Sequence, residues 1–245
     1  MTPHPLDRPV WASLSTLHQG LSFGGSEARR FDREVNVFAS TRDEGAESYR
    51  ALRELMAPGE RVYVLQVPEI VVPAGLEVVK RARGVQMLAE RSLGSEADAV
   101  MDGVADLCAD DAAQMLALAQ LTEPGPFLAG THRMGSFVGV RDVSGRAPAS
   151  PGMGAAGPRL LAMAGERLRL PGYTEVSGVC THPDARGRGW ARRLSTIVAA
   201  RIQARGDQPF LHAWTTNHTA IALYQSLGFV TRAEVNVAVL EKPTP

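Results

Sequence analysis

Residues 181–206 read THPDARGRGWARRLSTIVAARIQARG, and this stretch decides the fold. It begins at the end of a predicted strand, Tyr173–Thr181, and passes through a loop of proline, glycine and arginine into a helix. The basic turn and glycine at Arg205 and Gly206 are typical of a helix end. The apolar residues of the helix recur at helical spacing and are predicted to face inward: Leu194, Ile197, Val198 and Ile202.

A glycine-rich loop at the start of a helix is suited to binding a pyrophosphate. Its free N–H groups point in one direction, the helix dipole adds partial positive charge, and glycines let a ligand approach the backbone. Arg186 and Arg188 add two full charges. The six residues 186–191 alone are equally compatible with an arginine- and glycine-rich surface turn, so their context has to decide.

Two common nucleotide-binding loops do not fit this stretch. It lacks the Gly-Lys-Ser/Thr of a P-loop, and it lacks the three-glycine spacing and downstream acidic residue of a dinucleotide fold. The run HPDARGRGWA resembles instead the acyl-CoA loop of the GNAT superfamily of N-acyltransferases, whose pattern is Arg/Gln-x-x-Gly-x-Gly/Ala. Arg186, Gly189 and Ala191 occupy its fixed positions.

A second block carries the same resemblance. Residues 211–229, LHAWTTNHTAIALYQSLGF, are similar to the later strand and helix of that superfamily. The resemblance covers roughly residues 105–242, and the subgroup most similar in appearance is bacterial, with an extra N-terminal region before a GNAT domain. The matching residues of the second block are Asn217, Ala220, Leu223, Tyr224, Gly228 and Phe229.

The fold class predicted from the element order is α/β with a mixed sheet. A helix from Asp110 or Asp111 precedes strands at 137–141, 159–170 and Tyr173–Thr181, with a flexible connection at 146–158. After the decisive helix come a strand at 209–215, a helix at 216–227 and a strand or hairpin pair at 229–240. The resemblance implies a GNAT domain over 105–245.

Residues 1–104 are predicted to form a separate N-terminal α/β region, joined to the second half by the acidic stretch 93–111. Helices are indicated near 11–17 and 44–56, a buried strand at 62–67, and then a loop with another strand or short helix. These pieces are compatible with a degenerate GNAT-like half, although the region contains no phosphate loop.

The resemblance implies how an acyl-CoA would be held. The strand before the loop is expected to splay from its neighbour, so that its backbone pairs with the pantetheine amides as an added strand would. The cofactor-binding residues implied are Val179, Cys180, Thr181, Arg186, Gly187, Arg188, Gly189, Trp190, Ala191, Asn217, Ala220 and Tyr224. Trp190 departs from the usual small or aliphatic residue of the loop, and is expected either to pack on the sheet or to lie near the adenine.

Two residues are predicted to be catalytic. Glu175 lies four residues before Val179, where some family members place a general base, and strand alternation puts 175, 177 and 179 on one face. It could equally be a solvated or substrate-binding residue, and Glu166 is a second candidate. Tyr224 is expected to donate a proton to the leaving thiolate, with a packing role as the alternative.

The remaining reactive side chains are expected to have structural roles. His182 lies in the loop before the phosphate site, and His212 lies in a strand expected to be buried. Cys180 has no identifiable catalytic partner, so direct transfer is favoured over a covalent acyl-enzyme. The amine side of the site is expected near residues 122–127 and 172–175, with a contribution from the N-terminal region.

Composition narrows the function classes. The 26 basic residues balance the 26 acidic ones, so no overall field attracts nucleic acid or an anionic membrane. Two cysteines and the absence of a signal or membrane segment predict a cytoplasmic protein. No metal is expected, and the protein is expected to be a monomer or homodimer. The expected function is transfer of acetyl from acetyl-CoA to a small primary amine. The alternatives are a non-catalytic acyl-CoA-binding module and a protein N-acyltransferase whose N-terminal half recruits the substrate.

Overall fold

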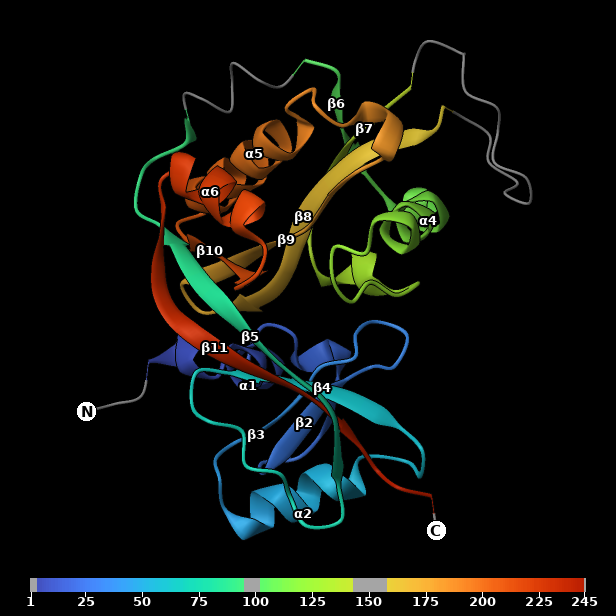
Figure 1. Cartoon of the computed structure of the whole chain (residues 1–245), viewed down its shortest axis with the longest axis vertical. Coiled ribbons are helices and arrows are strands. Elements are labelled where there is room, and N and C mark those ends of the chain that lie inside the picture. Colours follow the sequence, from blue (N-terminus) through green and yellow to red (C-terminus); the bar gives the residue numbers. More distant parts are fainter. Residues whose placement is uncertain (1–3, 95–101, 143–157, 245) are drawn as a thin grey trace.

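The structure, a computed structural model, describes residues 4–94, 102–142 and 158–244. Its main feature is an eight-stranded mixed sheet in the order β4-β11-β5-β10-β9-β8-β7-β6 (Figure 1). Helices α5 (Trp190–Ala204) and α6 (His218–Ser226) lie across the sheet from α4 (Ala112–Thr122). The predicted α/β class with a mixed sheet is therefore confirmed.

The second half of the chain follows the predicted element order. One further strand, β6 (Val104–Leu107), precedes α4 and was not predicted. The connection predicted at 146–158 lies outside the described residues except for Pro158, as does the part of the acidic junction between 95 and 101. The strands of this half are β7 (Phe137–Arg141), β8 (Leu160–Leu170), β9 (Tyr173–Thr181), β10 (Gln208–Trp214) and β11 (Phe229–Glu241).

The N-terminal region builds a smaller layer below the main sheet (Figure 1). It contains a three-stranded sheet, β1-β2-β3, and the two predicted helices. Its helices and strands are α1 (Pro9–Ser15), β1 (Ser22–Gly24), β2 (Ala28–Phe31), β3 (Ala39–Thr41), α2 (Ala46–Glu54), β4 (Arg61–Gln66) and β5 (Glu77–Ala89). Short 3-10 turns occupy Pro5–Asp7, Gln19–Leu21, Ala109–Asp111, Thr131–Met134 and Pro183–Ala185.

Strand β5 belongs to the N-terminal region in sequence but lies in the middle of the main sheet. It pairs antiparallel with β10 from Leu88↔Phe210 to Gly84↔Trp214, and with β11 on its other edge. Strand β4 pairs with the outer edge of β11. The sheet thus takes strands from both sides of the predicted boundary at 104/105. The division into domains and the degenerate GNAT-like half both stay predictions.

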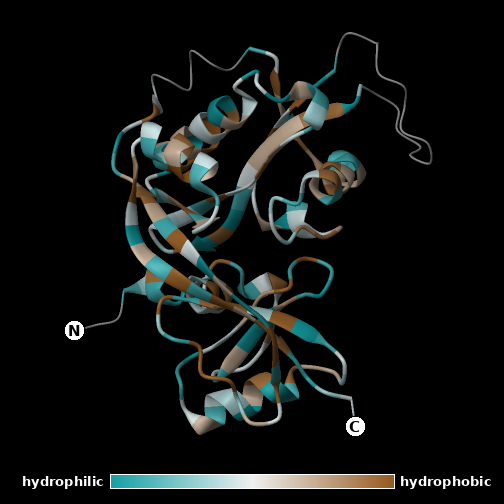
Figure 2. Ribbon diagram, viewed as in Figure 1, coloured by the Kyte–Doolittle hydropathy of each residue, from teal (hydrophilic) through white to brown (hydrophobic). Residues whose placement is uncertain are grey.

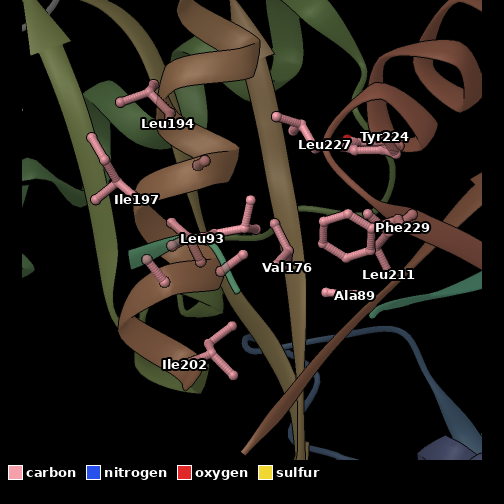
Figure 3. Close-up of a cluster of buried hydrophobic side chains, with 14 of the residues drawn as sticks. Ala89, Leu93, Val176, Leu194, Ile197, Ile202, Leu211, Tyr224, Leu227 and Phe229 are labelled. Carbon is pink, nitrogen blue, oxygen red and sulfur yellow. The ribbon is translucent and has the colours of Figure 1, made fainter. Parts of the chain in front are cut away.

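Apolar packing joins the two regions as well. One buried cluster lies between α5 and the sheet, where Val176, Leu194 and Phe229 converge (Figure 3). A second cluster combines N-terminal side chains such as Leu6 with Phe210 of β10. Burial of one such side chain contributes about 2 kcal/mol, so this cluster holds the N-terminal segment firmly on the sheet. Figure 2 shows hydrophobic and hydrophilic residues alternating along β5 and β11.

Within the described residues, no helix is both long and apolar enough to cross a bilayer.

Candidate active site

The site begins where β9 and β10 separate. These parallel strands pair only through Tyr173↔Gln208, Thr174↔Pro209 and Glu175↔Phe210. Along the rest of β9, its ladder with β8 is irregular, because the register moves from Gly165↔Ser177 to Met163↔Cys180. Gly178 takes the extra position with φ +62°, a left-handed backbone that favours glycine. The bulge bends β9 away from β10 and leaves a wedge between them, as the sequence predicted for this strand.

A groove of about 530 Å³ runs from this wedge to the start of α5. Gly187 and Gly189 turn the chain there with φ values of +75° and +76°. Within the described residues, no acceptor bonds the backbone N–H groups of Gly187, Arg188 or Gly189. Free N–H groups beside a helix N-terminus form a site for an anion such as a pyrophosphate. The predicted residues that line the groove are Val179, Cys180, Thr181, Arg186, Gly187, Gly189, Trp190, Ala191 and Asn217.

Trp190 is the first residue of α5, and of its two expected roles the packing role is observed, while a place near the adenine stays a prediction. Its ring packs against the cluster under α5 and also lines the groove. The Arg193 guanidinium lies over the ring, 4.4 Å from its centroid. Its buried indole Nε1 has no partner within the described part of the chain. The groove therefore offers free backbone amides and the Trp190 ring to an acyl-CoA.

A central cavity of about 180 Å³ continues from the groove into the wedge. It is lined by Val179 of β9, Trp214 of β10, and the helix residues Ala220 and Tyr224. Gly84 of β5 faces it, and an added Cβ at that position would lie 2.9 Å from the Ala213 carbonyl oxygen. The N-terminal strand therefore forms part of the wall of the cavity.

An outer cleft of about 510 Å³ adjoins the central cavity, with which it shares Tyr63, Trp214 and Val237. Its floor is the sheet face of β4, β5 and β11, with Tyr63, Ala82 and Val237. Its rim is the loop that follows α4, with Phe127 and Leu128. The predicted acceptor residues near 122–127 do line these cavities, and the N-terminal region contributes as expected. No residue between 172 and 175 lines them.

Tyr224 lies where the sequence places it. It is largely buried, contacts Phe229 with ring centroids 6.0 Å apart, and lines the central cavity. Burial raises the pKa of its phenol to about 12. The hydroxyl is therefore protonated at neutral pH, and it lies beside the Ser195 side chain of α5.

Glu175 has surroundings that differ from the sequence-based expectation. The side chain is 0% exposed and lines none of the three cavities, so the alternative of a solvated strand residue is wrong. Arg167 donates to both of its oxygens, at 2.8 and 2.7 Å. Burial acts to raise the pKa of Glu175, but Arg167, aided by His212, outweighs it and lowers the pKa to about 2. A buried carboxylate so engaged is poorly placed to take a proton from a substrate.

His212 connects Glu175 with the N-terminal region. Its Nδ1 lies 2.7 Å from Glu175 Oε1, and its Nε2 lies 3.0 Å from Gln86 Nε2. The Gln86 amide oxygen accepts from Arg232, so its nitrogen is the atom that faces His212 and donates. In this arrangement the His212 Nδ1–H donates to Glu175 Oε1 and Nε2 accepts from Gln86. His212 also lines the central cavity, with both ring nitrogens engaged, so the structural role that the sequence favoured stays a prediction.

The other candidates are also held in structural contacts. Glu166 is buried and paired with Arg205 at 2.7 Å, away from the cavities, which argues against it as a second base. His182 caps a 3-10 turn by accepting from the Asp184 N–H. Burial raises the pKa of the Cys180 thiol to about 11, so its thiolate is not available as a nucleophile.

The structure brings most of the predicted residues together and adds others. Arg188 is the cofactor-binding candidate that lines neither the groove nor the central cavity, since its guanidinium turns back to the Asp184 carbonyl oxygen at 3.4 Å. Ala220 and Tyr224 line the central cavity instead of the groove. The predicted acceptor segment 122–127 includes Glu123, but the sequence did not single this residue out, and it did not identify the residues of β4 and β5 that line the cavities.

Comparison with known proteins agrees with this geometry. The family model described as FR47-like protein matches residues 152–238. No curated protein matches the chain. A solved structure from Novosphingobium aromaticivorans, of a protein assigned to the acetyltransferases of the GNAT family, is 38% identical with a TM-score of 0.85, covering 99% of this chain and 100% of that one.

Two more distant structures share the fold. A GCN5-related N-acetyltransferase from Kribbella flavida has 18% identity and a TM-score of 0.56, covering 97% of this chain and 96% of that one. A protein of Drosophila melanogaster has 15% identity and a TM-score of 0.58, covering 89% and 74%. The splayed strands and the loop before α5 agree with the relative that is 38% identical over 99% of this chain. This chain therefore belongs to the GNAT family, whose members have an acyltransferase fold.

Proposed function

We propose that this protein transfers an acetyl group from acetyl-CoA to a primary amine, by direct attack in a ternary complex. The observation that carries the proposal is the continuity of the three cavities. Val179 lines both the anion-binding groove and the central cavity, while Trp214 lines both the central cavity and the outer cleft. Two substrates, one in the groove and one in the outer cleft, would therefore meet at the wedge between β9 and β10.

The groove supplies the contacts for the CoA moiety. Backbone amides of Gly187 and Gly189 and the Arg186 side chain are suited to the pyrophosphate, and the unpaired backbone of β9 to the pantetheine amides. When bound, acetyl-CoA supplies a thioester carbonyl that an amine attacks and a thiol that leaves. The C–N bond forms as the C–S bond breaks, and the electron pair leaves with the sulfur.

Two proton transfers accompany this reaction, one to water and one from Tyr224. The ammonium loses its proton to water in the cleft, because neither Glu175 nor His212 has a free acceptor facing the cavities. Tyr224 donates to the sulfur as negative charge develops there. Glu175 has a positioning role, in which it holds Arg167 and His212 beneath the cavity. The high pKa of Cys180 supports direct transfer over an acyl-enzyme.

The two free cysteines fit a reducing compartment, which supports the cytoplasm as the site of this reaction. The test is release of thiol from acetyl-CoA by the purified protein with a panel of amines, amino acids, aminoglycosides and N-terminal peptides. Amine-dependent release supports the proposal. Release only with peptides would point to a protein substrate. Tight acetyl-CoA binding with no release on any acceptor would instead indicate a binding module.

A further inference from the structure

Glu123 lies at the point where the three cavities meet. It lines the anion-binding groove, the central cavity and the outer cleft. Among the described residues that line them, it is the one carboxylate. Because Glu123 lines both the groove and the cleft, its charge lies close to the proposed positions of both substrates.

The backbone of Glu123 is unusual. It caps the C-terminus of α4 with φ +48° and ψ +54°, in the left-handed region. Within the described residues it is the only non-glycine residue with a positive φ. Glutamate is strained in this conformation, whereas glycine would adopt it without strain. Strain of this kind is retained where the surroundings or the function of the side chain require it.

The carboxylate of Glu123 is also available. The residue is exposed, and no hydrogen bond or ion pair holds its side chain in the part of the chain that the structure describes. Glu175 and Glu166, in contrast, are buried and paired with arginines. A free carboxylate beside the wedge can therefore receive a cation.

The outer cleft indicates what this cation is attached to. Tyr63, Val237 and Val239 give it an apolar floor, and the Trp214 ring, 40% exposed, stands at its junction with the central cavity. An apolar or aromatic body would remove this surface from water. Lys80 also lines the cleft, and its positive charge disfavours a second cationic group on the acceptor.

We infer that the acceptor is a monoamine with an apolar, aromatic-sized body, and that Glu123 binds its ammonium beside the wedge. This inference rests on the proposed function for the identity of the site. Polyamines and aminoglycosides are poor acceptors, because they bring further positive charge next to Lys80. The body of the acceptor lies on the sheet face of β4 and β11.

The experiment measures binding and turnover separately. Binding of phenethylamine, ethanolamine and putrescine is titrated calorimetrically in the presence of CoA, and thiol release from acetyl-CoA is followed with the same amines. Phenethylamine is expected to bind most tightly. Glu123→Gln is expected to weaken its binding and raise its KM by about 10- to 100-fold, as for loss of a charge-assisted hydrogen bond, with CoA binding unchanged.

Two further variants separate charge from backbone and from general effects. Glu123→Gly is expected to lose binding to the same extent while its melting temperature rises, because glycine relieves the left-handed backbone. Glu54→Gln removes an exposed carboxylate on α2 and is expected to behave as wild type. Trp214→Ala is expected to abolish the preference for phenethylamine over ethanolamine.

The outcomes are distinct. Unchanged phenethylamine binding in Glu123→Gln, equal binding of putrescine, or no amine binding by the wild type would overturn the inference. Thiol release with the same KM for phenethylamine in Glu123→Gln as in the wild type would also overturn the inference. It would leave the proposed function intact. Glu123-dependent binding of phenethylamine without any thiol release would support the inference and overturn the proposed function.

Discussion

The Arg167 guanidinium and the Glu175 carboxylate form a bidentate ion pair beneath the central cavity, with Nε to Oε2 at 2.8 Å and Nη2 to Oε1 at 2.7 Å. Glu175 has no exposed surface, whereas Arg167 also lines the cavity and lies 5.0 Å from the centroid of the Phe38 ring. The pair thus ties the centre of the sheet to the N-terminal region. It stabilises the wall of the site without contacting a substrate through the carboxylate.

Replacement of Glu175 by glutamine is expected to destabilise the fold. The change leaves Arg167 largely buried without its counter-charge, which costs about 3–5 kcal/mol. Urea unfolding measures the difference, with Glu54→Gln as the exposed control. Full stability in Glu175→Gln, together with a selective loss of turnover, would restore Glu175 as the general base.

Acid is expected to weaken the protein through the same group. The folded pKa of Glu175, about 2, lies below its ordinary value of 4.5. A lowered carboxyl pKa stabilises the folded state above the unfolded pKa, and this contribution is lost as the pH falls from about 4.5 to about 2. The stability gap between wild type and Glu175→Gln should therefore narrow over that interval in urea titrations. A gap independent of pH would contradict the assignment.

The bulge at Gly178 is expected to control both stability and CoA binding. Alanine there meets a φ of +62° and a contact of 3.0 Å with Phe137 Cε1. We expect a loss of about 1–2 kcal/mol and weaker CoA binding. Gly172→Ala is the matched control, since Gly172 has φ +79° in open space. Gly172→Ala should lose stability but keep its affinity for CoA. Equal loss of CoA binding in both variants would contradict a role of the bulge in binding CoA.

The two arginines of the loop are expected to contribute differently to the affinity for CoA. Arg186 lines the groove, whereas Arg188 turns back to the Asp184 carbonyl oxygen. Arg186→Ala should weaken CoA binding by about 10-fold, the lower end for a hydrogen bond to a charged group, and Arg188→Ala should change it less. Calorimetry with CoA, and with pantetheine as the ligand without a pyrophosphate, measures this. Equal effects on pantetheine would show that Arg186 does not act on the pyrophosphate.

Loss of the Tyr224 hydroxyl is expected to slow turnover. Tyr224→Phe keeps the ring in contact with Phe229 but removes the hydroxyl proposed to donate to the sulfur, so kcat should fall by roughly 10²-fold with KM little changed. Steady-state thiol release measures the effect, and Tyr49→Phe on α2 serves as the control. An unchanged kcat would assign Tyr224 to packing alone.

Local patterns in the sequence determined much of this protein. The glycine-arginine loop before α5, the apolar spacing of that helix, and the strand boundaries at Phe137–Arg141 and Tyr173–Thr181 are all short-range features, and each was predictable. They act through backbone conformation and helix termini, which depend on neighbouring residues. The groove residues around Arg186 follow from the same block.

Tertiary structure alone decided the rest. Glu175 is a predicted base by its place on β9, but Arg167 and His212, from β8 and β10, hold it in a buried ion pair. Strand β5 enters the sheet between β10 and β11, which nothing in its own residues indicates. The outer cleft is formed where β4, β5 and β11 meet the loop at Glu123. Pairing between strands that are distant in sequence depends on which sheet edges come together in the folded protein. A local sequence pattern therefore does not predict it.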